Sequence, residues 1–298
     1  MNMKVNLLFL YTESPLHIGA GASIAAVDLP IQRERTTQHP VVPGSSLKGV
    51  LRSQSADGDD KERKTIVFGP DPEEQKAHEH AGAITVGDAH VVLFPVRALS
   101  GVFAYVTCPL ALARLARDLR LVGLTPNWKV PTVQKDQALV TARSAVTVNG
   151  KVVLEEFTFM AQPSDDANAI AAWLAGNALP NGAEYDFWRQ KVQSSLVILP
   201  DDDFRDFVLN STEISTHVRL DPNTKTVAPR ALWTEEALPS DVLLCSLIIA
   251  RRSRRAGNDL DAKGVSDSLR AALPARLQLG GNETTGQGLV VSRWVEGA

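Results

Sequence analysis

The sequence predicts an α+β fold with a ferredoxin-like βαββαβ core that carries large insertions. Two observations lead to this prediction. The chain opens with an apolar strand at residues 3–13 and closes with another at residues 289–295. Amphipathic helices at residues 45–53 and 262–273 lie between those two strands, and further strands separate the helices. The order is therefore strand, helix, strands, helix, strand.

Local patterns place each element. In the first strand, Val5, Leu7 and Phe9 alternate with Leu8 and Leu10, so both faces are apolar, as is typical of a buried strand. The same reasoning predicts further strands at residues 83–86, 90–95, 102–107, 152–160, 195–199 and 242–250. Further helices are predicted at residues 110–122, 166–176, 184–193 and 201–209. The turn signal at residues 221–224 predicts a hairpin of strands 213–220 and 226–233.

Composition excludes several classes of protein. The 298 residues are 44% hydrophobic and 22% charged, which is typical of a globular protein rather than of disorder, collagen or a coiled coil. The longest mostly apolar run, residues 242–250, is too short to span a membrane. No signal peptide is evident, and Cys108 and Cys245 form no CxxC motif. We therefore expect a cytoplasmic protein without a membrane partner.

Charge is distributed unevenly along the chain. The net charge of −3 argues against a general nucleic-acid binder. Residues 29–56 nevertheless carry four basic side chains against one acid, whereas residues 57–76 carry seven acids against four bases. An acidic protein can carry a basic groove, so the net charge leaves RNA binding open.

The helix at residues 45–53 has the parts of an anion site. Ser45 or Ser46 is the expected N-cap, and the free N–H groups of a helix N-terminus attract phosphate. Lys48 and Arg52 are four residues apart and share one helix face. That face either contacts phosphates or is simply solvated.

Two further segments have the same two interpretations. A glycine-rich loop near the C-terminus either brings backbone N–H groups to a phosphate or makes a tight connection; its glycines are Gly280, Gly281, Gly286 and Gly288. An arginine-rich segment either contacts an RNA backbone or is a solvated loop; its arginines are Arg251, Arg252, Arg254 and Arg255. Arg230 and Trp233 on the second hairpin strand are further candidates for RNA contact.

Several of these motifs together resemble a known family. Residues 43–49, Pro-Gly-Ser-Ser-Leu-Lys-Gly, and the glycine-rich loop are similar to the two hallmark motifs of the RAMP superfamily of CRISPR proteins. Residues 27–34, 93–96, 107–109 and 226–239 resemble the backbone subunit of the type III-B Cmr effector complex. The resemblance is weak in residues 57–82 and 123–190.

The resemblance implies an architecture. We expect one RRM-like palm domain over residues 1–298, with insertions at about 57–82 and 123–190 and a thumb hairpin at about 213–237. Copies of such a subunit, together with other Cmr subunits, stack into a helical filament along a guide CRISPR RNA. The thumb displaces a base at regular intervals, and complementary target RNA is cut beside it.

The resemblance also implies a site. By its position in the motif, the cutting acid is Asp28, which is also the candidate ligand of a divalent metal cofactor, with Mg²⁺ the expected ion. His17, Glu235 and Glu236 are further candidates for acid–base work at that site. Cutting by a 2′-OH needs a splayed nucleotide, proton removal and charge neutralisation, and a wedge and a carboxylate supply part of this.

Two alternatives stay open. The chain is either a purely structural filament subunit or an RNA endonuclease that processes the guide precursor. The intact acid at position 28 favours a target-cutting enzyme over the structural subunit. The hairpin and the Asp28 loop favour a filament subunit over the precursor-processing nuclease.

Overall fold

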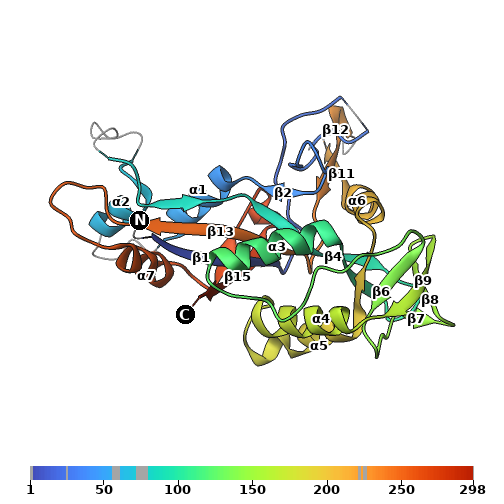
Figure 1. The fold of residues 1–298 in the computed structure, drawn as a ribbon. Helices are drawn as coiled ribbons and strands as arrows, with labels where there is room; N and C mark the ends of the chain where they lie inside the picture. The colour runs from blue at the N-terminus through green and yellow to red at the C-terminus, as the bar shows by residue number, and fades with distance from the viewer. Residues whose placement is uncertain are drawn as a thin grey trace.

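The computed structural model describes residues 3–24, 26–55, 61–71, 80–220, 223 and 227–297. Over these residues the fold is α+β, as predicted, with a large mixed sheet and a separate two-stranded hairpin (Figure 1). The strands are β1 (Met3–Thr12), β2 (Val41–Val42), β3 (Ile84–Val86), β4 (Ala89–Arg97), β5 (Phe103–Thr107), β6 (Gln137–Val140), β7 (Thr147–Val148), β8 (Lys151–Leu154), β9 (Phe157–Pro163), β10 (Leu196–Ile198), β11 (Glu213–Leu220), β12 (Val227–Ala237), β13 (Leu243–Arg251), β14 (Arg276–Gln278) and β15 (Leu289–Glu296). The helices are α1 (Gly44–Gln54), α2 (Lys61–Phe68), α3 (Pro109–Leu121), α4 (Asp165–Asn177), η1 (Ala183–Tyr185), α5 (Asp186–Ser195), α6 (Asp201–Asn210), α7 (Ala262–Ala272) and η2 (Glu283–Thr285).

Strand β1 is an interior strand of the large sheet. It pairs antiparallel with β13 on one side and with β15 on the other. The sheet continues in the order β14-β15-β1-β13-β4-β5-β10-β6-β9-β8-β7, while β3 pairs with β13 and β2 with β4. Because β1 is covered on both faces, its apolar residues from Leu7 to Tyr11 are almost completely buried, which confirms the prediction for this part of the strand.

Helices cover both faces of the sheet. Leu8 of β1 packs in one hydrophobic cluster with Leu47 of α1 and Leu269 of α7. Phe9 packs in a second cluster with Leu115 of α3 and with residues of α4 and α5. A strand with helices on both faces of its sheet is apolar along nearly its whole length. Alternate side chains of β1 therefore pack into two different hydrophobic clusters.

Several elements differ from the predictions. No helix is predicted within residues 57–82, but this range includes α2, whose last residues, Ile66 to Phe68, are buried; residues 56–60 and 72–79 lie outside the described part. The strand predicted at residues 152–160 is two strands, β8 and β9, which pair antiparallel. Helix α1 begins at Gly44 after Pro43 and has no side-chain cap, so the predicted capping by Ser45 or Ser46 is wrong.

The hairpin of β11 and β12 stands beside the long loop that follows β1 (Figure 1). Thr216 of β11 lies opposite Thr234 of β12, and β12 extends to Ala237, beyond the predicted end at residue 233. The predicted turn at residues 221–224 falls largely outside the described residues. In the described part of the chain, no helix has the length and apolar character needed to cross a membrane.

Candidate functional site

Three segments far apart in sequence meet at the base of the hairpin. The loop after β1 bonds to the end of β12 through Leu16 and Leu238, whose N–H and C=O groups exchange hydrogen bonds of 2.8 and 2.9 Å. The glycine-rich loop joins them, because the Gly281 N–H donates to the His17 carbonyl over 3.0 Å. Asp28, His17, Glu235 and Glu236, which are separated by up to about 220 residues, are therefore brought into one region.

Asp28 lies exposed on the loop and is held by one residue of β12. Its Oδ2 accepts hydrogen bonds from the Thr234 N–H (2.8 Å) and the Thr234 hydroxyl (2.9 Å), while its own N–H donates to that hydroxyl (3.0 Å). The backbone bond from Thr234 and then its side-chain bond lower the pKa of the Asp28 carboxyl. Asp28 therefore presents a charged, solvent-accessible carboxylate at a fixed point on the hairpin.

Backbone pairing fixes the loop around Asp28. The Leu29 N–H donates to the Thr234 carbonyl (3.0 Å), and the Glu236 N–H donates to the Leu29 carbonyl (3.0 Å). Leu29 thus forms a parallel bridge with Glu235. The loop behaves locally as an added strand beside β12, and this explains why a loop residue keeps a defined orientation.

His17 is bonded to strand β12 rather than to Asp28. Its Nδ1 is 2.6 Å from the Glu236 backbone carbonyl, which only accepts, so we assign a proton to Nδ1. Its Nδ1 is also 4.0 Å from Glu235 Oε1. No hydrogen bond or ion pair joins His17 to Asp28 in the residues that the structure describes.

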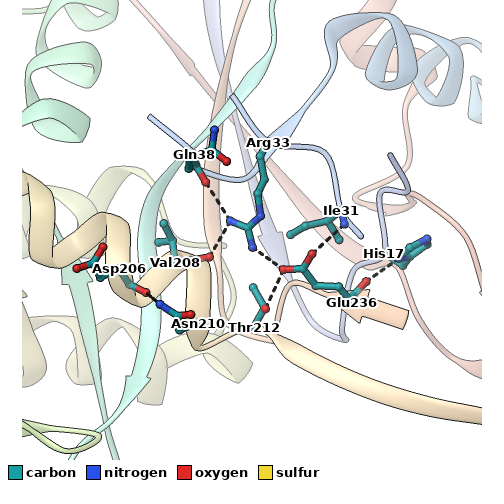
Figure 2. Close-up of polar contacts among 9 residues, drawn as sticks. All are labelled: His17, Ile31, Arg33, Gln38, Asp206, Val208, Asn210, Thr212 and Glu236. Atoms are coloured by element: carbon teal, nitrogen blue, oxygen red, sulfur yellow. Dashed lines mark hydrogen bonds and ion pairs between the residues drawn. The ribbon is translucent and has the colours of Figure 1, made fainter. Parts of the chain in front are cut away.

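The two glutamates on β12 are buried. Glu235 accepts a hydrogen bond from Asn282 of the glycine-rich loop. Glu236 accepts from the Ile31 N–H (3.0 Å), from the Thr212 hydroxyl (2.9 Å) and from the Arg33 guanidinium, as Figure 2 shows. Both carboxylates are thus buried and bonded within the protein, whereas the Asp28 carboxylate, though bonded to Thr234, is exposed.

The glycine-rich loop is packed mainly against the protein. A Cβ on Gly280, which has φ +76°, would lie 2.2 Å from the His17 carbonyl oxygen. A Cβ on Gly288, with φ +80°, would lie 2.1 Å from the Leu279 carbonyl oxygen. Gly286 has φ +84° and open space around it. Close approach of two backbone segments explains why glycine is needed at positions 280 and 288. Making a tight connection is therefore part of this loop's role.

The basic candidates form one cluster and several ion pairs. Burial, and then the neighbouring charges of Arg52 and Arg254, lower the pKa of Lys48. Arg52 also donates to the carbonyls of Gly69 (3.0 Å) and Pro70 (3.2 Å). Helix α1 and the arginine-rich segment therefore lie close together, although about 200 residues separate them.

The remaining members of these segments are placed individually. Ser45 and Ser46 are exposed in the first turn of α1. Arg252 is ion-paired with Asp259, and Arg255 with Glu62 at 3.1 Å. Arg251 ends β13 and is half-buried.

On the hairpin, the Trp233 ring stacks on the His217 ring, with centroids 5.4 Å apart and planes 16° apart. One face of the Trp233 indole is therefore already covered by the protein. Arg230 lies on β12, and its side chain is outside the described residues.

Whether this region could hold a metal ion depends on the donor groups that it brings together. Among the described residues, no group of three or more His, Cys, Asp and Glu side chains is placed to hold an ion. At the base of the hairpin, Asp28 offers an exposed carboxylate. This donor set fits Mg²⁺, which binds one or two carboxylates together with substrate phosphates, and it does not fit a cage made only of protein ligands.

The chain is similar in sequence to known proteins. The sequence model of the RAMP superfamily matches residues 9–291. The chain belongs to the RAMP superfamily. It is 43% identical, over 97% of its length and 95% of the relative's, to the CRISPR system Cmr endoribonuclease Cmr4 of Pyrococcus furiosus.

Solved structures of superfamily members agree with the fold. The crystal structure of oligomeric Cmr4 from Pyrococcus furiosus is similar, with a TM-score of 0.75 and 37% identity, and the match covers 99% of both chains. A chain of the type III-B Cmr-beta complex bound to cognate target RNA has a TM-score of 0.73 at 21% identity, covering 97% of this chain and 96% of that one. The latter likeness concerns the fold alone.

Sequence reasoning missed three residues of this site. Thr234, Asn282 and Arg33 contact candidate carboxylates. Each is an ordinary polar residue in its own segment. Only the pairing of the loop with β12 gives them their partners, so no local signal pointed to them.

Proposed function

We propose that this RAMP-superfamily chain is the backbone subunit of a type III-B Cmr effector complex, which binds a guide CRISPR RNA and cuts complementary target RNA at regular intervals. The relative at 43% identity is an endoribonuclease by its printed name. A related chain forms oligomers, and another structure of this fold contains target RNA. Guide RNA, target RNA, further copies of this chain and other Cmr subunits are therefore its expected partners, in the cytoplasm.

One observation carries the proposal: the exposed Asp28 carboxylate is attached to the hairpin strand β12. A hairpin that displaces a base leaves the neighbouring nucleotide splayed, with its 2′-OH turned toward its own phosphate. Cutting joins the 2′-oxygen to phosphorus and breaks the bond from phosphorus to the 5′-oxygen, so the 2′-OH loses a proton and the leaving 5′-oxygen gains one. Asp28 lies beside that phosphodiester, where its carboxylate serves either as the base for the 2′-OH or as the ligand of the metal. The protein contributes position and one ionised oxygen.

Mg²⁺ is the proposed cofactor, held by the Asp28 carboxylate and by phosphate oxygens of the target. When bound, it neutralises charge that develops on the phosphate. Glu235 and His17 have proposed supporting roles, because Glu235 lies within 4.0 Å of the His17 imidazole. Asn282 and the Glu236 carbonyl hold these two side chains in place.

We propose further that the palm of this single domain is ferredoxin-like. The strands β15, β1, β13 and β3 are neighbours in that order, and all three pairs are antiparallel. Helix α1 connects β1 to β3, and α7 connects β13 to β15. The order supports a βαββαβ core, with residues 57–82 and 123–190 as insertions and the hairpin as a thumb.

Guide binding is assigned to the basic cluster and the loops near it. Lys48, Arg52 and Arg254 supply positive charge, and the exposed Ser45 and Ser46 leave the first turn of α1 open to a phosphate. Further proposed guide contacts are Arg230, Trp233, Arg251, Arg252, Arg255, Gly280, Gly281, Gly286 and Gly288. Contacts to phosphates carry no sequence choice, which base pairing with the guide supplies instead.

The test uses the assembled complex with its guide RNA, with Mg²⁺ or with a chelator. Three labelled RNAs are offered: a complementary target, a non-complementary RNA and the guide precursor. The proposal predicts evenly spaced products from the complementary target alone, and only with the metal. Tight target binding without cutting would establish a structural subunit, and cutting of the precursor alone would establish a processing nuclease.

A further inference from the structure

The Arg33 side chain connects three elements at the base of the hairpin. Its guanidinium donates to the Gln38 carbonyl of its own loop (3.0 Å) and to the Val208 carbonyl near the end of α6 (2.9 Å). The third partner is the Glu236 carboxylate on β12 (Figure 2). The last carbonyls of a helix have no partner within it, so Arg33 also satisfies the end of α6.

Glu236 completes this contact from the other side. Its Oε2 accepts from the Ile31 N–H, and its Oε1 accepts from Thr212, which directly precedes the hairpin. The side chains of Arg33 and Glu236 are only 14% and 7% exposed. A planar guanidinium holds several acceptors at fixed angles. The pair therefore fixes the direction of the loop as well as balancing charge.

The pair lies at one end of the segment that carries Asp28. Arg33 is five residues after Asp28, and Glu236 is two residues after Thr234. Between them, Leu29 bonds to Thr234 and Glu236 through two backbone hydrogen bonds. Without the Arg33–Glu236 contact, those two bonds, the Thr234 contacts and the bond from Ile31 to Glu236 would be the remaining hydrogen bonds between this segment and β12 in the described residues.

We propose that Arg33 and Glu236 are positioning residues, which lock the Asp28 loop onto the hairpin so that the carboxylate and the base-displacing hairpin move as one unit. This inference rests on the proposed function. It gives Glu236 a role other than catalysis, because three internal donors occupy its oxygens. It also explains how cutting keeps a constant distance from the displaced base.

The test compares Arg33→Gln, Glu236→Gln and the double variant in the assembled complex. The matched control is Arg205→Gln, because Arg205 is also ion-paired, with Asp202, but on the exposed side of α6. Single-turnover assays with excess complex give the rate constant, the amplitude and the cut position at single-nucleotide resolution. Target-RNA affinity and the melting temperature are measured on the same preparations.

The proposal predicts that each single variant cuts about 10- to 100-fold more slowly, because small misplacement of a reacting group has effects of this size. The amplitude and the target affinity stay unchanged, and extra cuts appear at neighbouring bonds. The double variant is no slower than the slower single variant, since both remove one contact. Arg205→Gln cuts as the wild type does.

A purely structural pair would give a different result. It would lower the melting temperature or the amplitude and leave the rate constant and the cut positions unchanged, and this outcome would overturn the proposal. If the single variants do not assemble, the double variant decides on the same readouts, because it leaves no buried charge unpaired.

Asp28→Asn in the same assay separates the two proposals. If Asp28→Asn cuts as fast as the wild type, the proposed function loses its site. If Asp28→Asn is inactive while the Arg33 and Glu236 variants keep the wild-type rate and cut positions, only the positioning inference fails.

Discussion

The two halves of the loop after β1 differ sharply. The described residues of the tip, within 19–28, are mostly exposed and end in Asp28, whose carboxylate is bonded to Thr234 and to no other described residue. The base, residues 29–39, contains Arg33 and Glu34, whose charged groups are each bonded to several partners. The base therefore serves the fold, while the tip presents a carboxylate that the fold does not need.

Glu34 shows how firmly the base is anchored. Arg114 of α3 donates to both of its oxygens, at 2.6 and 2.9 Å, and His90 of β4 lies 2.6 Å away. Burial opposes ionisation of Glu34, but the hydrogen bonds from His90, Arg114 and Thr37 outweigh it and hold its pKa well below the usual range. Adjacent residues 33 and 34 thus tie the loop to two different parts of the molecule.

The largest expected effect on stability contrasts the two halves directly. Glu236→Gln leaves the nearly buried Arg33 guanidinium without its counter-charge and should lower the free energy of unfolding by about 3–5 kcal/mol. Asp28→Asn should lower the denaturant midpoint far less, because Asp28 and its bonds to Thr234 are exposed to solvent. Urea unfolding of both variants measures this, and equal losses in the two would break the comparison.

The next largest effect on stability is expected at Gly280, which packs against the start of the loop after β1. Gly280→Ala places a methyl group 2.2 Å from the His17 carbonyl oxygen and should cost about 3 kcal/mol. Gly286→Ala, also at positive φ but in open space, is the matched control and should cost only about 1 kcal/mol. Equal midpoints in chemical unfolding would show that the close approach at Gly280 is absent in solution.

The pH dependence of stability should reveal Glu34. A lowered pKa adds stability that is present above the unfolded value of 4.5 and is lost as pH falls toward the folded pKa. Glu34→Gln should therefore lower the free energy of unfolding by about 1–2 kcal/mol at pH 7 and by less at pH 4. The value at pH 7 is modest because His90 and Arg114 are partly exposed, so solvent weakens their attraction to Glu34. Thermal unfolding at both pH values tests this, and a pH-independent difference would contradict it.

The smallest effect lies at the tip. Thr234→Val removes the hydroxyl that bonds Asp28 but keeps the backbone N–H. Target cutting should slow only about twofold to tenfold, as expected for one exposed hydrogen bond. Thr216→Val, on the facing strand, is the control and should cut normally. A hundredfold loss in Thr234→Val would mean that the hydroxyl itself takes part in cutting.

Local patterns predicted much of the fold. The apolar run of β1 and the helical spacing of α1 gave both elements within about two residues at each end, because both patterns depend on neighbours in sequence. Helix α2 was missed because charged residues make up its first half and only its last turn is buried. The strand predicted at residues 152–160 is interrupted by a turn at Glu155, which has φ +50°. No sequence signal marked that turn.

The site was harder to predict. Asp28 came from a motif, and its partner Thr234 is 206 residues away. Pairing between a loop and a hairpin strand leaves no periodic pattern in either segment, so the contacts of Arg33, Thr234 and Asn282 appear only in three dimensions. The same pairing leaves Asp28 exposed and buries Glu235 and Glu236. The sequence alone does not show which of these three carboxylates is exposed.

The most direct measurement compares wild type and Asp28→Asn in the guide-loaded complex, with target affinity and single-turnover cutting measured together in Mg²⁺. The account predicts unchanged affinity and a nearly unchanged melting temperature, with cutting reduced by about 10²- to 10⁴-fold. Cutting by Asp28→Asn at the wild-type rate, or a parallel loss of affinity and cutting, would contradict it.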